Sequence, residues 1–208
     1  LKGVPPKPLQ KITARWGARD ANWFFDFPAS ALKVIEFLEA SKVYTDQLVK
    51  FSGAVAINTN VLKDIIDIVG PIEIPEYNLT MQSDNVIHEL QREVESGTDK
   101  AKGDPKKILK VLTPKIFERL QKLDGGGKQQ LLARLQERLE RKDVMVFFKD
   151  ATLQEHMREA GVAGDVMPLS NNFLGSYLAV VNANVGGGKS DAFVKQRVQT
   201  ETRLTPEG

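Results

Sequence analysis

Cysteine is absent from this chain of 208 residues, and histidine occurs only twice. Without cysteine, the sequence excludes disulfides, thiolate zinc sites and cysteine nucleophiles. His88 and His156 have no second histidine or carboxylate at the spacing of a zinc-binding helix, so we expect no zinc site. The Gly-x-Ser-x-Gly turn that carries the nucleophile of many hydrolases is also missing, which disfavours that class.

A long apolar run is lacking as well. No stretch approaches the roughly 20 residues that a membrane-spanning helix needs, and no signal peptide pattern occurs. Neither sign of charge dominates, because 29 Lys and Arg face 27 Asp and Glu, a net charge of +2. A general nucleic-acid binder usually carries a clear basic excess, so we expect no nucleic-acid partner. The ordinary composition, 41% hydrophobic and 27% charged, predicts a globular chain that folds as one domain over residues 1–208.

Apolar periodicity predicts an α/β fold in which a mixed sheet is covered by helices. Two of the helices, 105–123 and 128–141, are separated by a short glycine-rich link and predict a helical hairpin inserted within the domain, over residues 104–142. The expected strand-helix-strand unit at 53–74 leaves parallel or antiparallel pairing open. The other expected helices are 28–40, 59–69, 83–94 and 153–160, and the expected strands are 53–58, 72–74, 144–148, 176–181 and 192–204.

The sequence VGGGKS at 185–190 is similar to part of a phosphate-binding P-loop. That loop needs a glycine where this chain has Ala183, and it needs a helix afterwards, whereas residues 192–198 alternate like a strand. We therefore reject a nucleotide-binding loop in favour of a glycine-rich connection between strands. Lys189 can still contact an anion in a cleft.

The densest mixture of aromatic and charged residues lies at 15–28, RWGARDANWFFDFP. Large rings are costly to leave in water, and Arg and Asp are costly to bury unpaired, so this opening motif predicts a packed edge that faces a cleft. Guanidinium groups bind phosphate oxygens in bidentate fashion, and Asp and Asn oxygens suit Mg²⁺. The candidate phosphate ligands are Arg15, Arg19 and Lys189, and the candidate Mg²⁺ ligands are Asp20, Asn22 and Asp26.

A structural alternative explains the same residues. In it, Arg19 and Asp20 pair with neighbours, Asn22 and Asp26 cap turns, and the rings belong to the core. Residue types alone favour this alternative, since structural charge networks are common in proteins.

A set of short segments, taken in order along the chain, forms a recognisable pattern. They are RDANW and DFP of the opening motif, GAVAIN at 53–58, the run from Leu62 to GPIEI at 70–74, SDNV at 83–86, VFF at 146–148, and NAN at 182–184 followed by GKSD at 188–191. In these segments the chain resembles a bacterial and archaeal family catalogued as domain of unknown function 4012. That family is described as distantly similar to LytR-CpsA-Psr proteins, extracytoplasmic enzymes that move glycopolymers from polyprenyl diphosphate carriers to the cell wall with Mg²⁺.

The resemblance implies a LytR-CpsA-Psr-like fold and a place for this chain at the cell envelope, outside the cytoplasm. The RDANW region would lie near a lipid-phosphate cleft, and residues 53–73 would form a core strand-helix-strand. The implied function is Mg²⁺-assisted transfer, or binding, of a polyprenyl-linked phosphate or glycopolymer. The alternative is a non-catalytic binding or scaffold module. The aspartate and arginine pattern of the transferases cannot be laid onto this chain residue by residue, so no catalytic residue is assigned.

The chain is also expected to be an excerpt. It begins with Leu1, and residues 205–208 read as a turn into a partner strand that does not follow. Family members usually carry a membrane span and a glycine-rich segment before this point, so the resemblance implies a parent protein tethered to the cell membrane.

If a lipid tail binds, it needs an apolar tunnel between the layers of the fold. We expect such a pocket to be bordered by Ile35, Leu38, Leu62 and Ile66, with the arginines of the opening motif at its rim.

Overall fold

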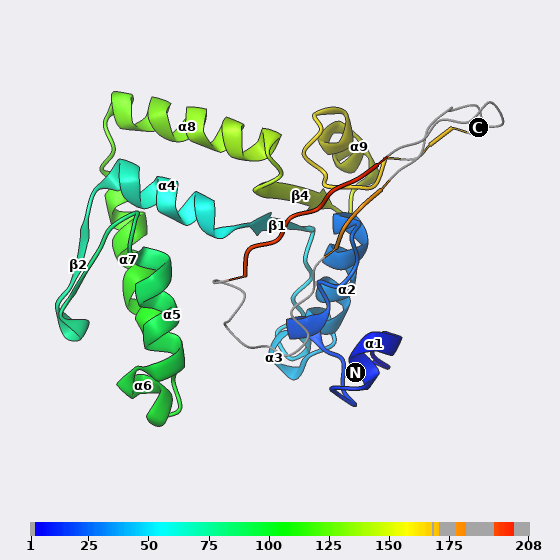
Figure 1. Cartoon of the computed structure of the whole chain (residues 1–208), viewed down its shortest axis with the longest axis horizontal. Coiled ribbons are helices and arrows are strands. Elements are labelled where there is room, and N and C mark those ends of the chain that lie inside the picture. The colour runs from blue at the N-terminus through cyan, green and yellow to red at the C-terminus, as the bar shows by residue number, and fades with distance from the viewer. Residues whose placement is uncertain (1–2, 168, 171–177, 182–193, 202–208) are drawn as a thin grey trace. The chain divides into compact units, whose positions relative to one another are not determined.

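The computed structural model describes residues 3–167, 169–170, 178–181 and 194–201. The chain divides into two compact units, one formed by Ala18–Pro168 and the other by Lys2–Gly17 together with Leu169–Gly208. In the second unit, the described residues contain one short helix, α1 (Lys7–Gln10), and an isolated bridge between Gly3 and Trp16. The first unit holds the other helices and strands of the described residues (Figure 1). Within this part of the chain, no helix is long and apolar enough to cross a bilayer.

The first unit is mainly helical. Its strands are β1 (Gly53–Ile57), β2 (Ile72–Ile74), β3 (Leu79–Met81) and β4 (Val144–Phe148). Its α-helices are α2 (Phe27–Glu39), α3 (Lys42–Thr45), α4 (Thr59–Val69), α5 (Val86–Ser96), α6 (Thr98–Ala101), α7 (Lys107–Gln121), α8 (Gly125–Glu140) and α9 (Ala151–Glu159), with single 3₁₀ turns at Ala18–Asp20 and Pro75–Tyr77.

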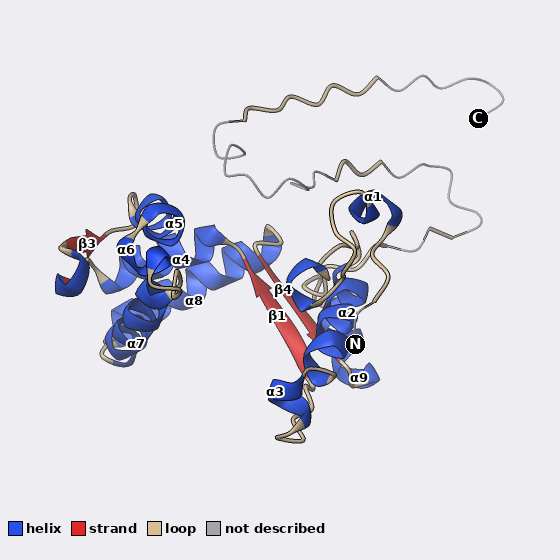
Figure 2. Ribbon diagram, turned by 90° about the horizontal axis from the view of Figure 1, so that it is seen from below, coloured by secondary structure: helices blue, strands red, loops and turns tan. Residues whose placement is uncertain are grey.

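The predicted α/β class is confirmed, but the described strands do not form one mixed sheet. They form two separate antiparallel pairs, β1 with β4 and β2 with β3 (Figure 2). β1 and β2 therefore belong to different sheets, and neither pairing left open for the strand-helix-strand unit occurs. The cause is local: the turn at Pro75–Tyr77 ends at Asn78 in the left-handed region, φ 51°, and this turn folds β3 back onto β2. Two further strands were expected, at 176–181 and 192–204. Their described parts, 178–181 and 194–201, lie outside any strand, and the rest of both lies outside the described residues.

The larger apolar core joins α4, α5, α7 and the β2–β3 pair. The helical spacing of the sequence is confirmed here, although on α4 it is Ile66 rather than Ile65 that is fully enclosed. On α7, Ile108 and Leu112 lie one helical turn apart and are almost completely buried. The buried members of this core are Ile66, Val69, Ile72, Ile74, Met81, Val86, Ile108 and Leu112.

A second apolar core lies between α2 and one face of the β1–β4 pair. Phe27, Ala31 and Ile35 from α2 pack there against Phe147 of β4. The expected tunnel required Ile35 and Ile66 to border one cavity. That expectation is wrong, because these two residues are buried in different cores, each filled by its own neighbours.

Helix α8 has no buried residue and is held to the unit by an ion network. Arg138 donates to both carboxylate oxygens of Asp64 on α4, at 2.6 and 2.9 Å, and to Asp143 before β4 at 2.8 Å. The side-chain amides of Asn58 and Asn60 also donate to Asp143. The network therefore connects α4, α8, the end of β1 and the start of β4.

The α7 and α8 helices follow one another through a short turn, yet their main contacts lie elsewhere. α7 packs against α4, α5 and β2, whereas α8 packs against α4 and β4 (Figure 1). That residues 104–142 are an insertion within a single domain stays a prediction.

The core assignment predicts the effect of truncating α4. Ile66→Ala should lower the free energy of unfolding by about 2–5 kcal/mol, because it removes buried methyl groups and leaves a cavity. Ile65→Ala is the matched control, since Ile65 is only partly buried at the edge of the same core and should cost clearly less. Urea unfolding of the two variants measures the difference. Equal losses, or a larger loss at Ile65, would contradict the assigned face.

Candidate functional site

Asp26 of the opening motif connects two distant segments of the chain through its carboxylate, a contact here called the clasp. It caps the start of α2, where one carboxylate oxygen accepts the backbone N–H of Ala29 at 2.9 Å. Its other oxygen accepts the N–H of Val166, 140 residues away in the sequence, at 3.0 Å. Beside it, the N–H of Phe27 donates to the carbonyl of Gly164 at 3.0 Å. With one oxygen on each segment, the Asp26 carboxylate links the start of α2 to the segment that follows α9.

Gly164 is required by this close approach. Its φ of +65° lies in the left-handed region, and a Cβ there would collide with Met145 and Phe27. A side chain at position 164 would therefore both strain the backbone and push the two segments apart.

The aromatic residues of the opening motif separate into two groups. The backbone of Phe24 is fixed by Ser30, which is 1% exposed and whose hydroxyl both accepts from the Phe24 N–H and donates to its carbonyl, each at 2.9 Å. The side chains of Phe24 and Phe25 are nevertheless 42% and 51% exposed, while Phe27 is buried. Only part of the aromatic set is core, so this edge of the unit presents rings to solvent.

Arg19 and Asp20 form an ion pair with each other, with Nε and Oδ1 separated by 3.2 Å. The Arg19 side chain is 90% exposed and that of Asp20 33%. Asn22 is exposed. Arg15 belongs to the other unit, where its backbone N–H donates to the Thr13 hydroxyl, and Lys189 lies outside the described residues. The structure thus describes only Arg19 of the three candidate phosphate ligands at this edge, and the phosphate site stays a prediction.

The candidate Mg²⁺ ligands fit a metal site poorly. Asp20 has a guanidinium partner, and both oxygens of Asp26 accept backbone N–H groups. Among the residues that the structure describes, no group of three or more His, Cys, Asp or Glu could hold a metal ion. The arrangement matches the structural alternative for Arg19, Asp20 and Asp26, and the Mg²⁺ site stays a prediction.

Glu39, which the sequence analysis missed, is the most strongly engaged carboxylate near α2. It accepts from Lys149 Nζ at 2.7 Å, from the backbone N–H of Phe51 at 2.9 Å and from Lys50 Nζ at 3.3 Å. These bonds, first of all that from Lys149, lower the pKa of Glu39 from 4.5 to about 2. A carboxylate in the last turn of a helix interacts unfavourably with the helix dipole. This position was the local feature of the sequence that could have indicated partners for Glu39 elsewhere in the fold.

A buried acid lies on α6. Asp99 is 8% exposed and accepts the hydroxyl of Tyr77 at 2.5 Å, with Lys107 Nζ 3.7 Å from its other oxygen. The Tyr77 hydrogen bond and the nearby lysines lower the pKa of Asp99. Burial, reinforced by Asp99, raises the pKa of Tyr77. The pair fixes the 3₁₀ turn after β2 to the start of α6.

A shallow groove of about 280 Å³ runs between α4 and α8. Its walls carry charges of both signs, and Arg134 and Glu137 face one another there at 3.7 Å. The lining residues are Asp67, Ile68, Gln130, Ala133, Arg134 and Glu137.

Residues 5–94 match the profile of a family described as a protein of unknown function (DUF4012). The match covers the opening motif, α2, β1 and α4, and it supports the resemblance stated from the sequence. It ends within α5, before α6. No curated protein and no solved structure matches the chain.

The two hydrogen bonds of the Asp26 clasp predict that Asp26 stabilises the fold. Asp26→Ala should lower the free energy of unfolding by about 1–2 kcal/mol, because it removes the helix cap and the bond to Val166. Asp26→Asn should cost less, since its amide oxygen can still cap α2. Urea unfolding measures both, with the exposed Asp46→Ala as a control expected to stay within about 0.5 kcal/mol of the parent. A loss at Asp26→Ala no larger than the control's would show that the clasp is not needed.

The lowered pKa of Glu39 predicts that the stability of the fold depends on pH. Its folded pKa is depressed, so its contribution to stability is fully present above pH 4.5 and is lost as the pH falls toward about 2. Glu39→Gln should therefore be less stable than the parent at neutral pH, and the difference should vanish over that acid range. Thermal unfolding of both proteins across this range measures the difference, in which the other carboxylates cancel. A difference that stays constant with pH would contradict the assignment.

Proposed function

We propose that this chain is a non-catalytic binding or scaffold module of a prokaryotic cell-envelope protein, located outside the cytoplasm and tethered to the membrane by another part of its parent protein. The observation that carries the proposal is the double engagement of Asp26 by backbone N–H groups. A carboxylate used in this way shapes the fold around the opening motif. The family resemblance supports the cell-envelope location.

Exposed apolar side chains support a binding role. Leu32 on α2 is 41% exposed, close to the exposure of Phe24, and on β1 Val55 and Ile57 are 63% and 64% exposed. Monomeric proteins carry single exposed apolar residues without consequence, but clusters on a rigid frame are typical of interaction sites. Val55 and Ile57 are such neighbours, because they share the face of β1 opposite to Ala54 and Ala56, which pack in the second core.

One observation favours the second candidate, a LytR-CpsA-Psr-like transferase that acts with Mg²⁺ on a polyprenyl-linked phosphate or glycopolymer. The Arg19 guanidinium has a single carboxylate neighbour and is 90% exposed, so it is accessible to an anionic group. Guanidinium is well suited to bind phosphate oxygens in bidentate fashion.

Calorimetric titration separates the two functions. Mg²⁺ and a polyprenyl phosphate are added together to the chain, to Asp20→Asn and to Arg19→Ala. If the chain is a non-catalytic module, neither substitution should change the heat of binding. Asp46→Asn is the control for a lost surface charge. A saturable, Mg²⁺-dependent signal that both substitutions weaken about tenfold or more, with the fold intact by circular dichroism, would replace the module by the transferase.

A further inference from the structure

Residues 100–128, here called the basic segment, concentrate positive charge. They contain nine Lys and Arg but only three Asp and Glu, a net charge of +6 in a chain whose total is +2. The rest of the chain therefore carries a net charge of −4. The basic segment spans the end of α6, all of α7 and the first turn of α8, and it lies beyond the family match at 5–94. It is a separate feature from the opening motif.

The packing of α7 fixes which side chains of the basic segment face solvent. Ile108 and Leu112 are 1% and 2% exposed in the larger core, so the opposite side of α7 points outward. Residues three or four apart share one face of a helix. Lys106 and Lys110, which precede and enter α7, are exposed and lie along the same outer face as Phe117, which is 60% exposed.

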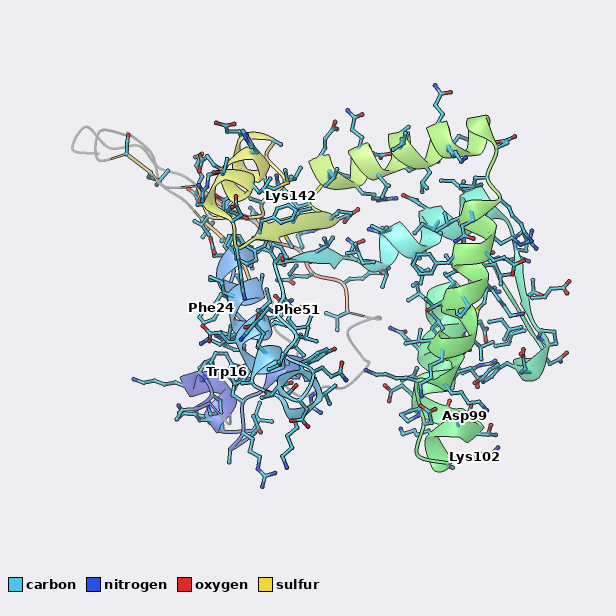
Figure 3. The ribbon with its side chains drawn as sticks, turned by 180° about the vertical axis from the view of Figure 1, so that it is seen from behind. Trp16, Phe24, Phe51, Asp99, Lys102 and Lys142 are labelled. Carbon is cyan, nitrogen blue, oxygen red and sulfur yellow. The ribbon has the colours of Figure 1, made fainter. Side chains whose placement is uncertain are left out.

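Local acids neutralise part of this charge. Lys110 is 2.8 Å from Asp104, Lys107 is 3.7 Å from Asp99, and Lys122 is 2.6 Å from Glu118. Lys102, at the end of α6, lies near Asp99 (Figure 3) and lowers its pKa without an ion pair of its own. Among the described residues, Lys106, Arg119 and Lys128 likewise form no ion pair within 4 Å. Exposed pairs are weak and screened, so the segment keeps a strongly positive field.

We propose that the outer face of α7 binds peripherally to an anionic lipid surface. Phe117 inserts its ring at the boundary of headgroups and acyl chains, and the surrounding lysines contact the headgroup phosphates. Lysines and an exposed aromatic ring on one face of a helix are the composition of interfacial helices. A soluble polyanion would use the lysines but would gain little from the ring. This contact goes beyond the proposed function and needs no chemistry at the opening motif.

Sedimentation with lipid vesicles tests the proposal on the whole 208-residue chain. The chain should bind vesicles of phosphatidylglycerol and phosphatidylcholine in equal parts, bind pure phosphatidylcholine weakly, and lose affinity as salt is added. Each lysine at an anionic surface contributes about fivefold, so the triple variant Lys102→Gln, Lys106→Gln and Lys110→Gln should bind about a hundredfold more weakly. Phe117→Ala should bind about tenfold more weakly.

A matched triple variant removes the same charge from exposed lysines elsewhere, with Lys11→Gln, Lys42→Gln and Lys195→Gln, and should bind nearly as well as the parent. Circular dichroism melts check that every variant folds. Absence of binding to the anionic vesicles, or equal losses in the two triple variants, would overturn the proposal. So would unchanged vesicle binding by Phe117→Ala together with equally tight binding to polyglutamate, since the partner would then be an acidic polymer.

Discussion

The guanidinium of Arg138 is the interaction on which the arrangement of the first unit depends. None of the apolar residues of α8 is buried, so apolar packing alone does not fix its position. Arg138 meets Asp64 with two parallel bonds and Asp143 with a third, a geometry that a lysine ammonium cannot reproduce. It lowers the pKa of both aspartates, and the side chains of all three residues are only about 15% exposed. Loss of any partner would leave largely buried charges uncompensated, so the three residues act as one element.

The sequence was informative about the fold wherever a single segment determines the outcome. The stripes of α4 and α7 follow from helical spacing, and the strands at 53–58 and 144–148 follow from their apolar runs. The pairing of the strands could not be predicted, because β1 pairs with β4, some 90 residues later in the sequence, and no local pattern encodes that contact. The strand β3 was missed because its three residues pair only through the turn that ends at Asn78, which folds them back onto β2.

At the candidate site, residue types predicted local chemistry better than they predicted assembly. The structural alternative gave Asp26 as a cap and paired Arg19 and Asp20 with neighbours. The cap and an Arg19–Asp20 pair are observed, because each partner lies within a few residues. The bond from Val166 to Asp26 could not be predicted, since it spans 140 residues. The same holds for Glu39, whose strongest partner, Lys149, lies 110 residues away. Side chains that look like ligands in the sequence can therefore already be bound, in the folded chain, by backbone groups or charges from distant residues.

The meeting of Asn58 and Asp143 has a consequence for the order of folding. These residues stand 85 positions apart, yet the Asn58 N–H donates to the Asp143 carbonyl at 2.9 Å, and their side chains are also bonded. Closing a loop of that length before it contains structure costs conformational entropy that a five-residue strand pair cannot offset. The enclosed chain, however, builds the larger core entirely from its own residues, between Ile66 and Leu112. That core can form first and shorten the effective loop, so we expect β1 and β4 to pair after it.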